Sequence, residues 1–214
     1  MLMTTEQNEW FQRMRGEWLR VMRPLEGYGP SSLFPRLRIL PAENLAECQL
    51  LPSREHLFEK LPKGGKVIEV GTQEGLFARF ILDHCQPDEL HLIDIDLKPL
   101  YDVGDKGLLE KAKAHEGDSS AILGTFPDGY FDWVYIDGDH SYEGVQRDAE
   151  VARLKVRPGG LLIFHDFTMW SPAECIDYGI PHVVCELSVN FGWKFVYFAL
   201  DPLMYCAVAL RRPE

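Results

Sequence analysis

The stretch KVIEVGTQEGLF, residues 66–77, contains an apolar run that ends in a glycine, with a second glycine four positions later. Residues 66–71 predict a buried strand, because short runs rich in β-branched residues and bounded by glycine are typical of strands. Apolar residues then recur at helical spacing from Leu76 to Ile81, which predicts a helix over 74–85. A strand that turns into a helix at glycines is a common start of a ligand-binding crevice in α/β proteins.

Further along the chain, strand and helix patterns alternate. Strands are expected over 66–71, 89–94, a short stretch around Glu116, 131–137 and 161–165, and helices over 74–85, 106–115 and 141–156. Two more strands, 193–200 and 204–211, follow each other across the tight turn Asp201-Pro202, which predicts an antiparallel hairpin at one sheet edge. The pattern predicts an α/β fold with a Rossmann-like, mostly parallel seven-stranded sheet, a terminal antiparallel hairpin and helices on both faces.

The N-terminal part of the chain has a different pattern. Thr4-Thr5-Glu6-Gln7 fits a capping box, and apolar residues follow at helical spacing, so residues 5–22 are expected to form an amphipathic helix. Residues 24–52 are rich in proline and glycine and are expected to be irregular, and Ser53 is expected to cap a short helix that ends at Leu61. We therefore divide the chain into an N-terminal helical cap segment, 1–52, and a ligand-binding domain, 53–214. The aromatic N-terminal helix suits a homodimer contact.

The composition favours a globular protein with a small-molecule ligand. Of 214 residues, 46% are hydrophobic, and 33 acidic against 22 basic residues give a net charge of −11. Such a surface repels nucleic acid and anionic membranes, so neither partner is expected. No uncharged apolar run approaches the roughly 18 residues of a membrane span. Residues 1–9 lack the apolar core of a signal peptide, and the five cysteines are scattered, so we expect a cytoplasmic protein.

The turn after the first strand carries the pattern E-x-G-x-x-x-G, formed by Glu69, Gly71 and Gly75, with Thr72 and Gln73 between the glycines. Gly71 allows a sharp turn and a close approach of a ligand, and Gly75 allows the helix to pack closely on the strand. Dinucleotide sites instead use G-x-G-x-x-G and place amides around a pyrophosphate. Acidic groups at this turn would repel a pyrophosphate, and they suit the ammonium and sulfonium groups of S-adenosylmethionine (SAM).

Two further segments are candidates for binding the nucleoside part of such a cofactor. Asp94 ends the second strand, 94 − 71 = 23 positions after Gly71, where an acidic residue commonly binds the ribose hydroxyls. Asp96 is the alternative, as a ribose ligand or as a helix cap. Asp118 and Ser119 follow Gly117 in a turn that would reach the adenine, although Gly-Asp-Ser is also common in ordinary turns.

Polar residues also gather at the ends of the strands 131–137 and 161–165. Asp137, Asp139 and His140 follow the first of these strands, and His165-Asp166 ends the second. Neighbouring parallel strands deliver these groups to one sheet edge, where carboxylates and imidazoles suit a divalent cation or a general base. Asp139 also fits a helix cap.

The segments IDGDHSYEGVQRD, residues 136–148, and RPGGLLIFHDF, residues 157–167, resemble class I SAM-dependent methyltransferases of the family that contains macrolide-sugar O-methyltransferases and cephalosporin hydroxylase-like proteins, with the motif D-G-x-H-x-Y. The resemblance covers residues 66–167. It implies catalytic roles for Asp137 and His140, with His140 as general base, and a divalent cation facing Asp137, His165 and Asp166. His165 stands where metal-dependent members commonly have an acid, and Mg²⁺ prefers oxygen ligands, so the site takes a softer metal or none.

The combined expectation is a SAM-dependent O-methyltransferase for a small hydroxylated metabolite. The cofactor ligands are expected to be Glu69, Gly71, Thr72, Gln73, Gly75, Asp94, Asp118, Ser119 and Asp137. One alternative is a SAM-binding protein without transferase activity. A nicotinamide-dependent oxidoreductase is the second, and the spacing of the glycines opposes it. Aromatic residues such as Trp170 and Tyr178 are expected to line an acceptor pocket or to pack in the core.

Overall fold

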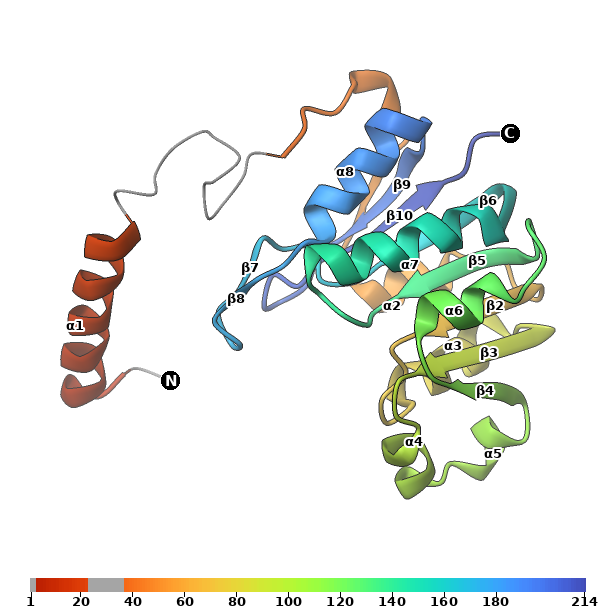
Figure 1. The fold of residues 1–214 in the computed structure, drawn as a ribbon, viewed down its shortest axis with the longest axis horizontal. Helices are drawn as coiled ribbons and strands as arrows, with labels where there is room; N and C mark the ends of the chain where they lie inside the picture. The colour runs from red at the N-terminus through yellow and green to blue at the C-terminus, as the bar shows by residue number, and fades with distance from the viewer. Residues whose placement is uncertain (1–2, 23–36) are drawn as a thin grey trace. The chain divides into compact units, whose positions relative to one another are not determined.

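The computed structural model describes residues 3–22 and 37–214, and the chain divides into two units, Met1–Leu37 and Arg38–Glu214 (Figure 1). In the first unit, α1 (Thr5–Met22) is the predicted helix. Its capping box forms as expected, because the Thr4 amide donates to Gln7 Oε1 (2.9 Å) and the Gln7 amide donates to Thr4 Oγ1 (3.2 Å). Residues 24–36 of the expected irregular segment lie outside the described residues.

The second unit is built on a mostly parallel sheet, which confirms the predicted fold class (Figure 1). Within residues 37–214 the sheet has eight strands, in the order β1 (Gln49–Leu51), β9 (Lys194–Ala199), β10 (Ala207–Arg211), β6 (Val156–Phe164), β5 (Phe131–Ile136), β2 (Lys66–Val70), β3 (Glu89–Asp94) and β4 (Ala112–Glu116). Only β10 runs antiparallel to its neighbours in this described sheet. The carboxyl ends of β2, β5 and β6 therefore lie side by side.

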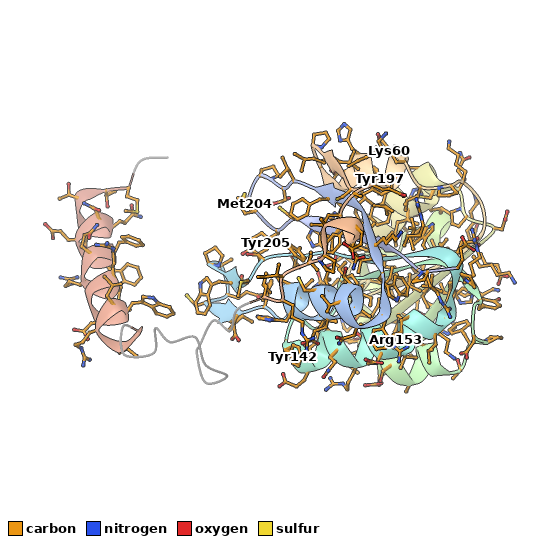
Figure 2. All side chains as sticks on the ribbon, turned by 90° about the horizontal axis from the view of Figure 1, so that it is seen from above. Lys60, Tyr142, Arg153, Tyr197, Met204 and Tyr205 are labelled. Carbon is orange, nitrogen blue, oxygen red and sulfur yellow. The ribbon has the colours of Figure 1, made fainter. Side chains whose placement is uncertain are left out.

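Helices cover both faces of the sheet (Figure 1). One core cluster lies under α6 (Ser119–Gly124), α7 (Tyr142–Lys155) and α8 (Ile180–Phe191). The other lies under α2 (Arg54–Glu59), α3 (Leu76–Cys85), α4 (Lys98–Val103) and α5 (Lys106–Leu109). Adjacent residues of β5 alternate between the two cores, with Val134 in the first and Tyr135 in the second, as the pleat of a strand requires. On the first face, the Tyr142 hydroxyl joins α7 to α8 through Glu186 Oε2 at 3.0 Å (Figure 2).

The predicted helix over 106–115 is only partly correct. The helix α5 ends at Leu109, and Ala112–Glu116 forms the edge strand β4. Its register pairs His91 with Lys113 and Ile93 with His115 along β3. Backbone pairing with β3 outweighs the helical preference of a segment rich in alanine and lysine.

The terminal hairpin forms as predicted, but its connection and its position differ from the prediction. The loop 200–206 joins β9 to β10, and the Asp201 side chain organises this loop by accepting from the amides of Leu203 (2.7 Å) and Tyr205 (3.3 Å). Met204 and Tyr205 lie in this loop (Figure 2). The hairpin is not at the sheet edge, because β1 pairs in parallel with β9 on its outer side. Residues 38–51, expected in the N-terminal segment, thus belong to the compact unit.

Two short strands form a separate ribbon after β6, namely β7 (Trp170–Ser171) and β8 (Ile176–Asp177). A 3₁₀ turn, η2 (Ala42–Asn44), precedes β1.

All five cysteines lie in the described residues and are unpaired. None of the helices in 3–22 and 37–214 combines the length and apolar character needed to span a bilayer.

Candidate functional site

The turn between β2 and α3 is fixed by a backbone contact that requires glycine. Gly71 has φ +88°, and a Cβ at this position would lie 2.1 Å from the carbonyl oxygen of Asp137. The Asp137 amide donates to the Val70 carbonyl at 2.8 Å. The close approach expected for a ligand is thus made by the chain itself, and it ties the end of β5 to the first turn.

Gly75 has a related role, although its contact differs from the predicted one. It has φ +76°, and a Cβ there would lie 2.5 Å from Leu100 Cδ1 and 3.0 Å from Leu108 Cδ2. These side chains belong to α4 and α5. Gly75 therefore allows those helices, rather than the strand, to pack closely on α3.

The first of two cavities at this edge has a volume of about 400 Å³. Its lining residues are Val70, Gly71, Gln73, Ile93, Asp94, Ile95, Gly117, Asp118, Ser119, Asp137, Gly138, Asp139, Arg147 and Asp148. Asp94 Oδ2 accepts from the Gln73 amide at 2.7 Å, whereas Asp96 Oδ1 accepts from the amide of Lys98 at 2.8 Å, at the start of α4. The geometry thus places Asp94 at the cavity and gives Asp96 a capping contact.

The far end of this cavity contains a carboxylate that sequence reasoning missed. Asp118 caps α6 by accepting from the Ala121 amide at 2.8 Å, and Ser119 Oγ donates to Asp148 Oδ1 at 2.5 Å. Asp148 is 4% exposed, and burial raises the pKa of its carboxyl group. The Arg147-Asp148 pair that ends the DGDHSYEGVQRD segment is the one sequence signal that pointed to it.

A second cavity of about 310 Å³ adjoins the first, since Gly71, Gln73 and Asp137 line both. Its lining residues are Arg54, Glu69, Gly71, Thr72, Gln73, Glu74, Leu76, Phe77, Asp137, His140, His165 and Asp166. The two cavities form one crevice along the carboxyl ends of β2, β5 and β6, where parallel α/β sheets bind ligands. Apart from Gly75, every residue predicted for the cofactor, the catalysis or the metal lines this crevice.

Asp137 is surrounded by donors at the junction of the cavities. Its Oδ2 accepts from the Tyr135 hydroxyl (2.7 Å) and from Arg54 Nη1 (3.2 Å), and its Oδ1 lies 3.2 Å from His165 Nδ1. The Arg54 guanidinium lies over the ring of Phe77 at 3.9 Å. Sequence reasoning missed Arg54 and Tyr135, because neither lies in a motif that identifies it as a partner of Asp137.

Asp166 lies between two histidines. It has φ +55°, which is unusual for a residue with a side chain, and its two oxygens contact different rings. Asp166 Oδ1 lies 3.1 Å from His165 Nδ1, and Oδ2 lies 2.9 Å from His140 Nε2. Burial alone would raise the pKa of Asp166, but the contacts with His140 and His165 outweigh burial and hold the pKa far below its usual range.

His165 is the cation of this cluster. Burial lowers the pKa of His165, but its contacts with Asp137 and Asp166 outweigh that effect and raise the pKa to about 9. The ring is therefore an imidazolium at neutral pH. It balances one of the two carboxylates, and Arg54 balances the other.

His140 is oriented from two sides. Its Nε2 lies at ion-pair distance from Asp166 but is poorly aligned for a hydrogen bond, and its ring lies 4.4 Å from the ring of Tyr178. The Tyr178 hydroxyl donates to Glu174 Oε2 at 2.5 Å, so β8 and the residues beside it hold the histidine in place. Burial opposes protonation of His140, but Asp166 and nearby acidic groups outweigh burial and raise the pKa. Such a pairing suits a general base.

Glu69 lies beneath the second cavity. It is 1% exposed and accepts from Thr72 Oγ1 at 3.2 Å. Burial, together with the nearby charge of Asp137, raises the pKa of Glu69 well above its usual range. The negative charge expected here for binding an ammonium group is therefore disfavoured while no ligand cation is present.

The side chains brought together include a possible metal-binding group, but they do not fit a resident divalent cation. One donor atom each from Asp137, His140 and Asp166 lies within 4.8 Å of the others, and His140 takes the place that the sequence assigned to His165. Every oxygen of the two carboxylates already contacts Arg54, Tyr135 or a histidine. A cation at Asp137 would have to displace His165 from Oδ1, or Arg54 and Tyr135 from Oδ2, and Mg²⁺ prefers oxygen ligands to the imidazole of His140.

The donors do fit the nucleoside and amino-acid parts of SAM. Asp94 offers a carboxylate at one end of the crevice, Ser119 and Asp148 offer polar groups beside it, and Glu69 and Arg54 offer an acid and a cation at the other end. The two cavities together have room for a ligand of that size. The polar groups at both ends of the crevice therefore suit the parts of SAM that they would contact.

Comparison with known proteins gives a family match and a fold match. Residues 68–167 match the family model described as "Methyltransferase domain". Spermidine synthase 2 of Hyoscyamus niger is 26% identical over 152 residues, covering 64% of this chain and 49% of that protein. The chain spans about half the length of the curated relatives it matches.

Two solved structures have the same fold. An S-adenosylmethionine-dependent methyltransferase from Mesorhizobium loti matches with a TM-score of 0.54 at 18% identity, covering 73% of this chain and 96% of that one. TrmK of M. capricolum, solved in complex with S-adenosyl-homocysteine, matches with a TM-score of 0.55 at 14% identity, covering 77% of this chain and 70% of that one. At these identities the likeness is one of fold.

Proposed function

From the methyltransferase domain of residues 68–167, set in the class I SAM-dependent methyltransferase fold, we propose that this chain transfers a methyl group from SAM to a hydroxyl oxygen of a small metabolite. The D-G-x-H-x-Y motif supports a place in the family that contains macrolide-sugar O-methyltransferases and cephalosporin hydroxylase-like proteins. The observation that carries the proposal is the crevice of two joined cavities, one suited to a nucleoside and one containing an oriented base.

The first cavity is proposed to bind the adenosine part of SAM. Asp94 is proposed to accept from the ribose hydroxyls, with Asp118 and Ser119 beside the adenine. When bound, SAM supplies an electrophilic methyl group on a sulfonium. The chain must then hold the acceptor oxygen in line with that methyl group, and the second cavity is the place for this acceptor.

His140 is proposed to accept the proton of the acceptor hydroxyl. Its Nε2 faces Asp166 at 2.9 Å, which leaves Nδ1 to take the proton. Asp166 stabilises the imidazolium that forms, and Tyr178 keeps the ring in place. Asp137, held by Tyr135, Arg54 and His165, is proposed to position the acceptor at the junction of the cavities.

We propose that this reaction needs no divalent cation. The two carboxylates of the site are already balanced by Arg54 and His165, and the proton has an acceptor in His140. The second candidate, metal-assisted transfer, rests on the close approach of Asp137, His140 and Asp166. Turnover in EDTA compared with turnover in Mg²⁺ or Mn²⁺ separates the two.

The first experiment is calorimetric titration of the purified protein with S-adenosylhomocysteine. Micromolar binding would support the cofactor, and a screen of small hydroxylated acceptors would then test turnover. Binding without turnover of any acceptor would favour the SAM-binding protein without activity. Failure to bind in both EDTA and Mg²⁺ would overturn the proposal.

Asp94→Ala tests the assignment of the ribose site. The loss of a charge-assisted hydrogen bond should weaken S-adenosylhomocysteine binding by about 1.5–3 kcal/mol. Asp96→Ala is the matched control, because Asp96 contacts the α4 amide of Lys98 and does not line the cavity. A larger loss of affinity in the Asp96 variant would reverse the assignment.

We propose the cytoplasm as the location, on the basis of the five unpaired cysteines. Three further expectations stay predictions. They are a small-molecule acceptor, no nucleic-acid or membrane partner, and a homodimer through α1. Light scattering of the full chain, compared with a Trp10→Ala variant, tests the homodimer.

A further inference from the structure

Arg54 lines the second cavity, and neither a motif nor the family resemblance had assigned a function to it. It is the first residue of α2, and its side chain is 25% exposed. Its guanidinium is held from three directions, by the ring of Phe77, the hydroxyl of Tyr135 and the carboxylate of Asp137. A long side chain fixed in this way has lost most of its conformational freedom before any ligand arrives.

The contacts of Arg54 use one part of the guanidinium. Both hydrogen bonds, to Tyr135 at 2.9 Å and to Asp137 at 3.2 Å, are donated by Nη1. A guanidinium carries five N–H donors in a planar fork, and those on Nη2 and Nε suit a carboxylate that binds with both oxygens. Arg54 therefore has donors to offer to an anionic ligand group while it still holds Asp137.

The charges around the second cavity single out this side chain. Among the described lining residues, the groups that can carry a positive charge are Arg54, His165 and His140, and the Nε2 of His140 faces Asp166. His165 directs its Nδ1 at both Asp137 and Asp166. Arg54 is then the cation in position to bind an anion in this part of the crevice, and the remaining charged groups would attract cations.

The proposed cofactor has one anionic group. Its adenosine part belongs to the first cavity, at Asp94, and Gly71 and Gln73 continue the wall into the second. The amino-acid part would therefore extend into the second cavity, with its ammonium near Glu69. The carboxylate on the same carbon atom would then come within reach of the Arg54 guanidinium.

On the basis of the proposed function, we propose that Arg54 binds the α-carboxylate of SAM and makes the site specific for the carboxylated cofactor. The acid beside it completes the recognition of a zwitterion, because Glu69 lies in the same cavity wall. The chain would thus distinguish SAM from its decarboxylated form at a residue outside the first strand–helix turn.

The test is a cycle of calorimetric titrations with two ligands and two proteins. The ligands are S-adenosylhomocysteine and its decarboxylated analogue, in which hydrogen replaces the carboxylate. The unsubstituted protein should bind S-adenosylhomocysteine about ten- to a hundredfold more tightly than the analogue, as expected for a charge-assisted pair. In Arg54→Gln that preference should fall to about twofold or less, mostly through weaker binding of the carboxylated ligand.

Two further variants make the result specific. Arg147→Gln removes the cation of the first cavity, whose ion pair with Asp139 spans 3.8 Å, and should leave the ratio of the two affinities unchanged. Arg54→Lys keeps the charge but not the fork, so it should retain part of the preference. It also serves as the test if Arg54→Gln fails to fold, which circular dichroism would reveal.

The outcomes separate this inference from the proposed function. Equal affinity of the unsubstituted protein for both ligands, or a preference that survives in Arg54→Gln, would overturn the role of Arg54 and leave SAM binding intact. A partial loss of preference in Arg54→Lys, together with an unchanged ratio in Arg147→Gln, would support recognition by the fork. No binding of either ligand by the unsubstituted protein would overturn both proposals.

Discussion

The molecule contains two pairs of histidines that differ in their surroundings. His91 and His115 lie on β3 and β4, with His91 Nδ1 2.9 Å from His115 Nε2 and with the ring of Phe126 against both. His140 and His165 lie after β5 and β6, and both contact Asp166. Burial lowers the pKa of both histidines in the first pair, whereas the acidic groups outweigh burial and raise the pKa in the second.

The difference shows that burial keeps a histidine neutral here unless nearby carboxylates outweigh it. His91 is 3% exposed, and its Nε2 lies 3.6 Å from Glu89 Oε2 without a hydrogen bond, so burial outweighs that carboxylate and lowers the pKa of His91. His165 is also mostly buried, but its Nδ1 has two carboxylates at about hydrogen-bond distance. A neutral pair that stacks on aromatic rings serves packing, and a pair held by carboxylates can exchange protons.

The largest expected effect comes from substituting His140, the proposed general base in the second pair. His140→Gln should lower turnover by about 10²- to 10⁴-fold, because it removes the general base. Affinity for S-adenosylhomocysteine should stay within about twofold, since His140 lies outside the first cavity and is proposed to contact the acceptor rather than the cofactor. His115→Gln, in the first pair, should leave turnover close to that of the unsubstituted protein. Initial rates at saturating SAM check both variants, and equal rates in the two would remove the base assignment.

A smaller effect should follow from neutralising the shared carboxylate. Asp166→Asn keeps the shape of the side chain but removes a charge 3.1 Å from His165 Nδ1, so the pKa of His165 should fall from about 9 toward its ordinary value. The titration of the ring proton signals by NMR measures this shift. Asp139→Asn is the control, because Asp139 is paired with Arg147 and does not contact His165. If the pKa of His165 did not move, Asp137 alone would be its counter-charge.

The smallest effect should appear in the pH dependence of stability. The folded pKa values of His91 and His115 are lowered, so the unfolded chain binds protons first, and their contribution is lost as pH falls below about 6.5 toward the folded values. The folded pKa of His165 is raised to about 9, so its contribution is present below about 6.5 and is lost as pH rises through about 9. The two pairs therefore limit stability from opposite sides.

Urea denaturation midpoints from acid to mildly alkaline pH measure these two limits. His115→Gln should flatten the acid side of the profile and leave the alkaline side unchanged. The glutamine amide can still donate to His91 Nδ1, so the packing contact is retained. An acid side as steep as that of the unsubstituted protein would mean that the first pair does not set it.

Much of the fold and part of the site could be predicted from contiguous patterns. The strand ends at Asp94, Asp137 and Asp166 are each carried by an apolar run followed by polar residues, and parallel strands bring such ends together. Arg54 could not be predicted in this way, because 83 positions separate it from Asp137 and only the packing of α2 places it there. The edge strand β4 was predicted mainly as helix, since its pairing with β3 is not visible in local periodicity.

The short strand β1 has a consequence for the behaviour of the protein in concentrated solution. Without it, the outer side of β9, with the sequence KFVYFA, would expose a row of free backbone donors and acceptors on an aromatic-rich strand. Such an edge is a template for pairing with another chain and for aggregation. The three residues of β1 pair with Tyr197, Phe198 and Ala199, so they cover the second half of β9 and form an edge too short to recruit a long partner strand. Gln49–Leu51 therefore shortens the part of β9 that is open to pairing with another chain, an effect independent of any catalysis.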